Sequence, residues 1–539
     1  MRDPANPAIG DDVSPPKSKH AAAEGPWSAE IAEIERRREI AAAHGGAEQV
    51  ARHHAAGRLT IRERIHRLLD AGSFEEIGGL AAAVDRDEGG AATRITPANS
   101  VLGTGRVDSR DIVVHGEDAT IRGGSSDGGG SAKGYYADEL AYQLRVPLVR
   151  LIEGVGGSVK TNRRFHTERP LAPGSEPPRW IDLLGMTPVV SAAMGAVAGL
   201  PAARMAMAHF SIMVRDAVIF AGGPPLVERA LGRRITKEAL GDFRIHAEVS
   251  GLVDNVAEDE ADCLRQIRRF LSYLPTNVWE QPPWRPSDDD PARRDQALAS
   301  IIPRDRRQPY DTRRVVAAVV DRGSFFELQP GFGSSLVTGL ARADGHPIGV
   351  VANDPRHLGG AMDATAADKM TRFVDLCDTF HLPILSLEDE PGYMIGPEAE
   401  QAGTLRSGVR ALAAVKQTTV PWITFIVRRA YGVAAAVHLG VTGLLYAWPS
   451  AEWGSIPIEG GVAAAYRREI AAAPDPERRR RELEASHEGD RSPFPRAEAF
   501  GLHDLVDPRQ TRPLTVSFTR RAYQTLKSTL GVKRRTLRP

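Results

Sequence analysis

Cysteine is nearly absent from this chain, which holds only Cys263 and Cys377. Two thiols cannot supply a four-thiolate zinc site or a network of disulfides. We therefore expect no metal site on this chain and a reduced, cytoplasmic setting for the protein.

A basic excess is absent as well. The 69 lysines and arginines are balanced by 69 aspartates and glutamates, so the formal net charge is zero. A protein that follows the phosphates of nucleic acid normally carries a clear basic excess. The balance argues against nucleic acid as the main partner.

Long apolar runs are also missing. The longest candidates, residues 189–200 and 420–427, fall short of the roughly 18 residues that a membrane-spanning helix needs. We therefore expect no membrane segment. Residues 1–27 are rich in proline, alanine, lysine and aspartate and lack the apolar stretch of a secretory signal, so they are predicted to form a disordered leader.

Motifs of several enzyme classes do not occur. The sequence has neither a His-Glu-x-x-His zinc motif nor a phosphate-binding Gly-x-x-x-x-Gly-Lys-Ser/Thr loop. One Gly-x-Ser-x-Gly match runs from Gly124 to Gly128, but Gly129 and Gly130 follow it. This favours a flexible loop over the strand-to-helix turn that presents a nucleophilic serine. The sequence therefore offers no convincing nucleophile.

What the chain does contain is an internal repeat. Its 539 residues favour two domains. Several residues return in the same order 236 positions later: Gly123-Gly124 as Gly359-Gly360, Lys133 as Lys369, Glu153 as Asp389, and Gly156 as Gly392. Matches in one register indicate a duplicated domain. In each copy β-rich runs alternate with helical patterns, which predicts α/β layers built from βαβ units.

The repeat also suggests where the domains begin and end. Residues 276–294 are rich in proline and aspartate, which is typical of a linker. We predict a leader over residues 1–27, an N-terminal domain over 28–275, a linker over 276–294 and a C-terminal domain over 295–539. Residues 31–54 are predicted to form one charged amphipathic helix, and a helical tail is expected from about Ser517.

The strongest functional signal is a strand-to-helix junction in each copy, at residues 194–201 and 429–436. Small residues there let the backbone approach a ligand closely. The first amides of a helix have no partner inside the helix, and the helix dipole adds positive partial charge. One such junction could simply reflect close helix–strand packing. Two in matching places fit a reaction with two enolate-like oxygens, such as carboxyl transfer to an acyl-CoA.

Six segments resemble a known family: residues 57–65 (GRLTIRERI), 69–76 (LDAGSFEE), 223–227 (GPPLV), 390–393 (EPGY), 446–452 (YAWPSAE) and 507–512 (DPRQTR). They resemble the β, or carboxyltransferase, subunits of propionyl-, acetyl- and methylcrotonyl-CoA carboxylases. The resemblance implies two tandem crotonase (ClpP-like) domains of the α/β class, related by internal duplication. It also implies transfer of a carboxyl group from carboxybiotin to the α-carbon, or the vinylogous carbon, of an acyl-CoA.

The resemblance places the reacting groups. Gly199 and Leu200 are expected to hold the enolate oxygen of the acyl-CoA, and Val433 and Ala434 the carbonyl of biotin. Further residues are expected to bind substrate: Gly123, Gly124, Gly156, Gly157, Gly359, Gly360, Gly392, Gly432 and Ala436. The family usually has Gly-Gly where this chain has Gly199-Leu200, and often Gly-Ala at Val433-Ala434. Ala436 stands where propionyl enzymes typically carry aspartate, which suggests room for a longer or branched acyl group.

The resemblance also implies partners. No Ala-Met-Lys-Met-type biotinylation site occurs in the sequence, so biotin is expected on another chain, the α subunit with biotin carboxylase and biotin carrier functions. The family forms hexamers in which the N-domain of one subunit and the C-domain of its neighbour share an active site. We therefore expect a homo-oligomer of that kind.

Two other interpretations stay open at this point. The chain could be a crotonase-type acyl-CoA decarboxylase or hydratase that works without biotin. A hydratase would need paired acidic residues near the junction, and the turn around Gly199 offers none in sequence. Alternatively, Leu200 and Val433 could mark a non-catalytic paralogue that only organises a complex.

Overall fold

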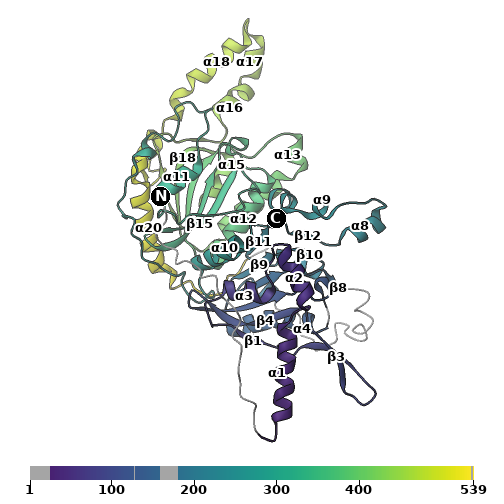
Figure 1. The fold of residues 1–539 in the computed structure, drawn as a ribbon. Coiled ribbons are helices and arrows are strands. Elements are labelled where there is room, and N and C mark those ends of the chain that lie inside the picture. The colour runs from purple at the N-terminus through teal and green to yellow at the C-terminus, as the bar shows by residue number, and fades with distance from the viewer. Residues whose placement is uncertain (1–24, 127, 158–179, 536–537, 539) are drawn as a thin grey trace.

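The chain forms two large sheets, one in each half, in a computed structural model that describes residues 25–126, 128–157, 180–535 and 538 (Figure 1). The expected leader over residues 1–27 therefore lies almost wholly outside the described residues. In the described part of the chain, no helix is both long and apolar enough to span a membrane.

The first sheet has seven strands. In spatial order they are β1 (Glu75–Ile77), β4 (Ser100–Val107), β5 (Arg110–Glu117), β7 (Leu148–Ile152), β9 (Val189–Ala193), β11 (Phe210–Val214) and β13 (Asn255–Ala257). The pairs β1–β4 and β4–β5 are antiparallel, and every pair from β5 onward is parallel.

The second sheet repeats this order. Its strands are β14 (Phe326–Leu328), β15 (Leu336–Ala343), β16 (His346–Asn353), β17 (Ile384–Glu390), β18 (Trp422–Tyr431), β19 (Gly443–Ala447) and β21 (Asp504–Leu505), and β20 (Glu452–Gly454) also pairs with β18. Strands β15, β16 and β17 begin 236 residues after β4, β5 and β7. Helices α4 (Gly128–Leu144) and α12 (Ala364–Thr379) begin at the same spacing. The predicted α/β duplication is confirmed.

The other helices and short strands connect, cover or project from these sheets. In the first half they are α1 (Ser28–Ala42), α2 (Ala47–Ala55), α3 (Ile61–Leu68), β2 (Ala82–Arg86), β3 (Ala92–Pro97), β6 (Ser125–Ser126), β8 (Gly156–Gly157), α6 (Trp180–Leu183), β10 (Ala196–Ala198), α7 (Leu200–Ala206), β12 (Val218–Phe220), α8 (Pro224–Leu231), α9 (Lys237–Gly241) and α10 (Glu260–Tyr273). In the second half they are α11 (Thr312–Val319), α13 (Pro397–Gln401), α14 (Thr404–Lys416), α15 (Gly432–Ala435), α16 (Ile458–Ala465), α17 (Arg467–Ala472), α18 (Pro476–Ser486), α19 (Phe494–Glu498) and α20 (Thr511–Leu526). Helix α1 and the α16–α18 arm project from opposite ends of the molecule (Figure 1).

Alternation along the strands assigns each sheet face to a helix layer. On β5, Ile112 and Val114 pack in one apolar cluster with residues of α3 and α10, whereas Val113 packs on the other face with residues of α4. Parallel strands covered on both faces are buried along most of their length, because apolar helix surfaces lie on both sides. The polar residues on these faces therefore need an explanation.

One apolar core joins the two halves. Phe210 on β11 meets Phe326 on β14 edge-on, with ring centroids 5.8 Å apart, and Tyr273 at the end of α10 stacks on the same Phe326. Residues 276–294 form no helix or strand, but Val278 and Arg285 bind the backbone of Met186 and Gly345. The predicted domain boundaries stay predictions; the segment between them is anchored to both halves.

Some local predictions are wrong. Residues 31–54 form two helices, α1 and α2, instead of one. Gly46 between them has a φ of 95°, and a Cβ at Gly45 would lie 2.0 Å from the carbonyl oxygen of Thr120. The chain therefore turns where only glycine fits. The C-terminal helix α20 begins at Thr511, six residues before Ser517, and α4 already begins at Gly128 within the expected glycine loop.

Candidate active site

The junction of the first copy lies where β10 leads into α7. Gly199 precedes the helix with a φ of 68°, in the region that favours glycine. Leu200 is the first helical residue, its side chain is 37% exposed, and its amide has no acceptor among the described residues. The backbone thus presents a free N–H group at a helix start, as the sequence predicts.

The junction of the second copy has the same form. Gly432 follows β18 with a φ of 65° and begins α15. The side chain of Val433 is 57% exposed, and Ala434 is buried beside it. No acceptor for the amide of Val433 lies in the described part of the chain. The two junctions correspond to each other in conformation as well as in sequence.

Paired glycine turns face the ends of the sheets. Gly123 and Gly124 have φ angles of 62° and 78°, and Gly359 and Gly360 have 63° and 86°. A Cβ at Gly124 would lie 2.7 Å from the carbonyl oxygen of Glu153. Only glycine accommodates both the conformation and the close approach.

The first copy brings several predicted glycines together. Strand β8, formed by Gly156 and Gly157, pairs with β6 directly after Gly124. A Cβ at Gly156 would lie 3.1 Å from the carbonyl oxygen of Ala198 and 3.8 Å from the Cα of Gly199. The amide of Ala198 donates to the carbonyl of Gly154 at 2.9 Å. The backbone of residues 154–157 therefore lies against residues 198 and 199, directly before the Leu200 amide.

The second copy is assembled differently. The carbonyl of Gly392 accepts from the amide of Met362, close to Gly360 in the chain. Gly432 instead approaches the carbonyl oxygen of Ser455, which lies 3.2 Å from where its Cβ would be. Ala436, in the short turn after α15, is half-buried. Nothing among the described contacts links Gly392 directly to Gly432.

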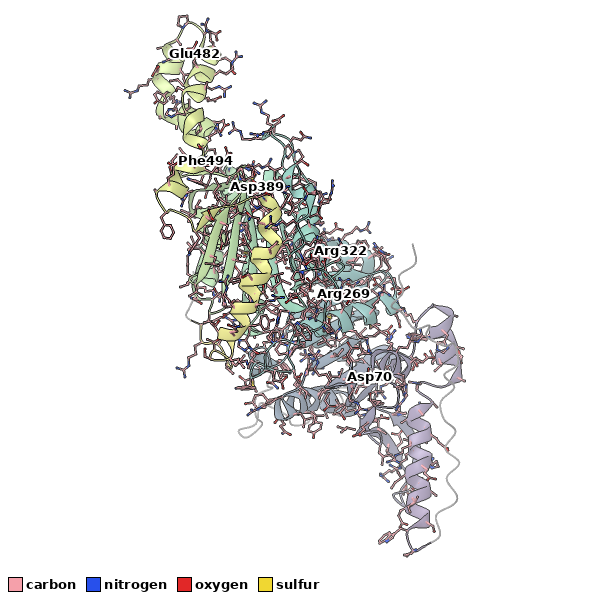
Figure 2. The ribbon with its side chains drawn as sticks, turned by 90° about the vertical axis from the view of Figure 1, so that its left-hand side faces the viewer. Asp70, Arg269, Arg322, Asp389, Glu482 and Phe494 are labelled. Carbon is pink, nitrogen blue, oxygen red and sulfur yellow. The ribbon has the colours of Figure 1, made fainter. Side chains whose placement is uncertain are left out.

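A buried acid held by two arginines lies behind each junction. Glu153 accepts from Arg58 at 2.7 Å and from Arg64 at 2.6 Å. Its counterpart Asp389 accepts from Arg428 at 2.9 Å and from Arg429 at 2.6 Å. Asp389 lies near the end of the second sheet from which the α16–α18 arm rises (Figure 2).

The ion pairs favour the ionised form of at least one of these acids, Asp389. Burial alone would raise the pKa of Asp389, but Arg429 and Arg428 hold it below its ordinary value. The sequence pairs Glu153 with Asp389 through the repeat, but it does not reveal the arginines. They come from different places in the two copies, α3 with the residues before it in one and β18 in the other.

Two buried lysines tie the long helices to the sheets. The ammonium group of Lys369 on α12 donates to the carbonyls of Gln329, Phe332 and Leu336 at 2.7, 3.0 and 2.6 Å. Lys133 on α4 donates to the carbonyl of Ser100 at 2.9 Å, the residue that corresponds to Leu336. The repeated lysine therefore has a positioning role in both copies.

Other buried polar residues escaped the sequence reasoning. Burial raises the pKa of Glu117, at the end of β5, to about 7. In the second copy, Ser386 bonds to His438 at 2.9 Å, and Glu390 lies 3.7 Å from the same imidazole. Burial and the charge of Glu390 also raise the pKa of Glu388. The alternation of side chains along each strand could have revealed these residues, because they are polar and lie at positions that face an apolar layer.

His53 and Asp289 also have partners within the fold. The side chain of His53 is mostly buried, and its Nε2 lies 3.2 Å from the carbonyl oxygen of Leu59 and 3.6 Å from Glu153. Asp289, in the segment between the two halves, accepts from Arg293 at 2.9 Å.

A cavity of about 500 Å³ lies between the two halves. His209, Asp254 and Arg372 are among its lining residues, and none of the predicted site residues takes part. Among the described residues, no group of three or more histidine, cysteine, aspartate or glutamate side chains is arranged to hold a metal ion.

Comparison with known proteins decides the family. A family model described as the carboxyl transferase domain matches residues 52–537. The chain belongs to the carboxyl transferase family. This confirms the resemblance to carboxylase β subunits and the expectation of an acyl-CoA carboxyltransferase enzyme.

Individual relatives of this carboxyl transferase cover nearly its whole length. The carboxyltransferase subunit of propionyl-CoA carboxylase from Haloferax mediterranei is 36% identical over 89% of this chain and 94% of its own. The methylmalonyl-CoA decarboxylase subunit alpha from Veillonella parvula is 32% identical over 88% and 92%. The crystal structure of transcarboxylase 12S matches with a TM-score of 0.84 and 29% identity, over 97% of this chain and 98% of that one. The predicted pair of crotonase-like domains is confirmed.

Proposed function

We propose that this carboxyl transferase moves a carboxyl group from carboxybiotin, carried on a partner chain, to the α-carbon of an acyl-CoA. The observation that carries the proposal is the pair of helix-start amides at Leu200 and Val433, which have no acceptor among the described residues and are each preceded by a glycine in the left-handed region. Named relatives support it, because the similar Haloferax protein is a carboxyltransferase subunit of propionyl-CoA carboxylase.

The first junction is assigned to the thioester. Loss of the α-proton turns the acyl group into an enolate with negative charge on oxygen. The amides of Gly199 and Leu200 donate to that oxygen, and each well-placed donor contributes roughly 3–4 kcal/mol to the transition state. The approach of Gly156 to Gly199 keeps this part of the backbone free of side chains.

The second junction is assigned to the ureido ring. Biotin, when bound, supplies the carboxyl group, and its ring oxygen gains charge as that group leaves. The amides of Val433 and Ala434 would hold this oxygen. The donor set fits a neutral, planar urea, because backbone amides match a carbonyl acceptor and bring no competing charge.

The acyl group is proposed to be propionyl or larger. Ala436 carries a small, half-buried apolar side chain after α15, which leaves space that a longer side chain would fill. The transcarboxylase structure that this chain resembles has methylmalonyl-CoA bound. Kinetics that favoured acetyl-CoA over every longer acyl-CoA would overturn this assignment.

Partners follow from the reaction. The biotin is assigned to an α subunit with biotin carboxylase and carrier functions. A hexamer is proposed because the transcarboxylase relative is described as a hexamer assembly. Two buried, unpaired thiols are consistent with a reducing, cytoplasmic setting.

Reconstitution tests the proposal. The chain is mixed with a biotinylated carboxylase subunit, ATP, bicarbonate and a panel of acyl-CoAs of increasing length. Carboxylated product that requires both chains is the expected result, with propionyl-CoA or a larger acyl-CoA preferred. Absence of product with every acyl-CoA, from a folded chain and an active partner, would overturn the proposal.

A second candidate is decarboxylation of a malonyl-type thioester. A specific observation favours it, because the similar Veillonella protein is a methylmalonyl-CoA decarboxylase subunit. The same two junctions could serve either direction of carboxyl movement. The direction of net transfer separates the two functions: release of carbon dioxide from methylmalonyl-CoA, with no ATP-dependent carboxylation of propionyl-CoA by the same complex, would favour the decarboxylase.

A further inference from the structure

Glu117 is a buried carboxyl group beside the first junction. It ends β5, is 6% exposed, and lies on the same strand face as His115. By the repeat, its counterpart on β16 is Asn353, which is 1% exposed. The two copies therefore place an acid and a neutral amide at one structural position.

The amide in the second copy shows what this position does. The Oδ1 atom of Asn353 accepts from the backbone N–H of Asp389 at 3.0 Å. Its Nδ2 atom donates to the carbonyl of Gly360 and to Glu390, both at 3.0 Å. The side chain of Asn353 thereby joins the glycine turn to the end of β17. To do so it needs one hydrogen-bond acceptor and one donor.

Glu117 repeats half of this arrangement. Its carboxyl group accepts from the backbone N–H of Glu153, the counterpart of Asp389. Among the described residues its Oε2 atom has no hydrogen-bond partner. That atom lies against Gly154, where a Cβ would be only 2.1 Å away. An oxygen thus occupies the place of the Asn353 donor, and only a protonated carboxyl can donate from it.

The charges around Glu117 do not balance an ionised carboxylate. Arg204 on α7 lowers the pKa, but it forms no hydrogen bond to Glu117 among the described contacts. Glu153 raises the pKa, although Arg58 and Arg64 pair with it. Burial is the largest influence and raises the pKa of Glu117 to about 7.

Other ionisable groups on this sheet face are already occupied or neutral. Burial holds the pKa of His115 well below its ordinary value. Arg150 pairs with Asp138, and Lys133 donates to the carbonyl of Ser100. None of them replaces the proton that the position of Glu117 requires.

A short chain of contacts connects this carboxyl to the junction. Gly154 touches Glu117, and its carbonyl accepts from the amide of Ala198, the residue before Gly199. A Cβ at Gly124 would lie 3.2 Å from the Cα of the same Gly154. A change at Glu117 would therefore affect the backbone at both Gly124 and Gly154, close to the first junction.

We propose that Glu117 is a positioning residue for carboxyl transfer: in its neutral form Oε2 donates to the carbonyl of Gly124, the counterpart of the Gly360 carbonyl that binds Asn353, and ionisation of Glu117 releases the backbone beside the first junction. The carboxylate form cannot donate, and its negative charge opposes an enolate held close by. The inference rests on the proposed function. It predicts that kcat falls at alkaline pH because one side chain, Glu117, ionises.

The pH dependence of transfer to propionyl-CoA tests the inference in the reconstituted complex. Above about pH 7, kcat of the wild-type chain should fall about tenfold per pH unit, as for one ionising group. Glu117→Gln keeps a neutral donor, so it should retain activity near pH 6.5 and lose the alkaline limb. Glu117→Ala should be impaired at every pH. Glu88→Gln, in an exposed loop, serves as the matched control and should keep the wild-type profile.

A second variant keeps the test decisive if Glu117→Gln does not fold. Asn353→Asp places an ionisable carboxyl at the corresponding position of the second copy and should steepen the loss of kcat at alkaline pH. An unchanged alkaline limb in folded Glu117→Gln, or an unchanged profile in Asn353→Asp, would overturn the inference. Absence of transfer by the wild-type chain at any pH would instead count against the proposed function, which separates the two failures.

Discussion

Replacing Leu200 by proline isolates a single backbone amide. The substitution removes one N–H group at the first position of α7, where proline is well accepted because its φ suits a helix start. Pro201 already follows in the same turn. The lost amide has no acceptor among the described residues, so no internal hydrogen bond is broken. The side chain is 37% exposed and contributes little to the core.

The expected effect is therefore catalytic. Loss of one oxyanion donor lowers kcat roughly 100- to 1,000-fold, which corresponds to about 2.7–4 kcal/mol. Leu200→Ala is the matched control, because it trims the same side chain and keeps the N–H group. Its kcat should stay within about threefold of wild type, since an exposed side chain carries little transition-state binding.

Single-turnover transfer from a carboxylated partner to propionyl-CoA is the assay. Circular dichroism and thermal melting establish that both variants keep the fold. Equal rates for Leu200→Pro and Leu200→Ala would refute the assignment of this amide to the enolate. A loss confined to KM would mean that the amide binds thioester and transition state equally.

Three further predictions concern the second junction, the buried acid and the acyl pocket. Val433→Pro should lower kcat by a similar factor of roughly 100 or more, while Val433→Ala should not, and apparent affinity for propionyl-CoA should stay unchanged in both. Because the pKa of Glu117 rises from 4.5 to about 7 on folding, the unfolding free energy should fall as pH rises between these values. Glu117→Gln should therefore be more stable than wild type by about 3 kcal/mol at pH 8, with little difference near pH 4.5, as measured by denaturant unfolding. Equal stability differences at both pH values would contradict this. Ala436→Asp should shift the kcat/KM ratio toward shorter acyl-CoAs, and an unchanged ratio would remove Ala436 from the acyl pocket.

The repeat made much of the fold predictable. A fixed spacing of 236 residues locates equivalent strands, and glycines such as Gly123 and Gly359 mark turns that other residues rarely adopt. The repeat is found by comparing the sequence with itself, and each glycine turn is recognised from adjacent residues, so neither requires knowledge of the folded structure. The two junctions were found for the same reason, because small residues between a strand and a helix form a continuous stretch of sequence.

The supporting contacts could not be read in this way. Arg64 is 89 residues from Glu153 in the chain, and their contact exists only once α3 packs on the first sheet. The exchange of Glu117 for Asn353 between the copies likewise depends on Gly154, whose missing side chain leaves space for the carboxyl group. The break between α1 and α2 was readable at Gly45 and Gly46, but a charged helical pattern on both sides concealed it.

Transfer between two small molecules on the isolated chain tests the central claim most directly. The chain is incubated with free biotin and methylmalonyl-CoA labelled with heavy carbon in its free carboxyl group, and carboxybiotin is trapped and weighed by mass spectrometry. The account predicts labelled carboxybiotin and propionyl-CoA in equal amounts, with both lowered by Leu200→Pro and by Val433→Pro. Propionyl-CoA formed without labelled biotin, or transfer that neither proline variant slows, would contradict it.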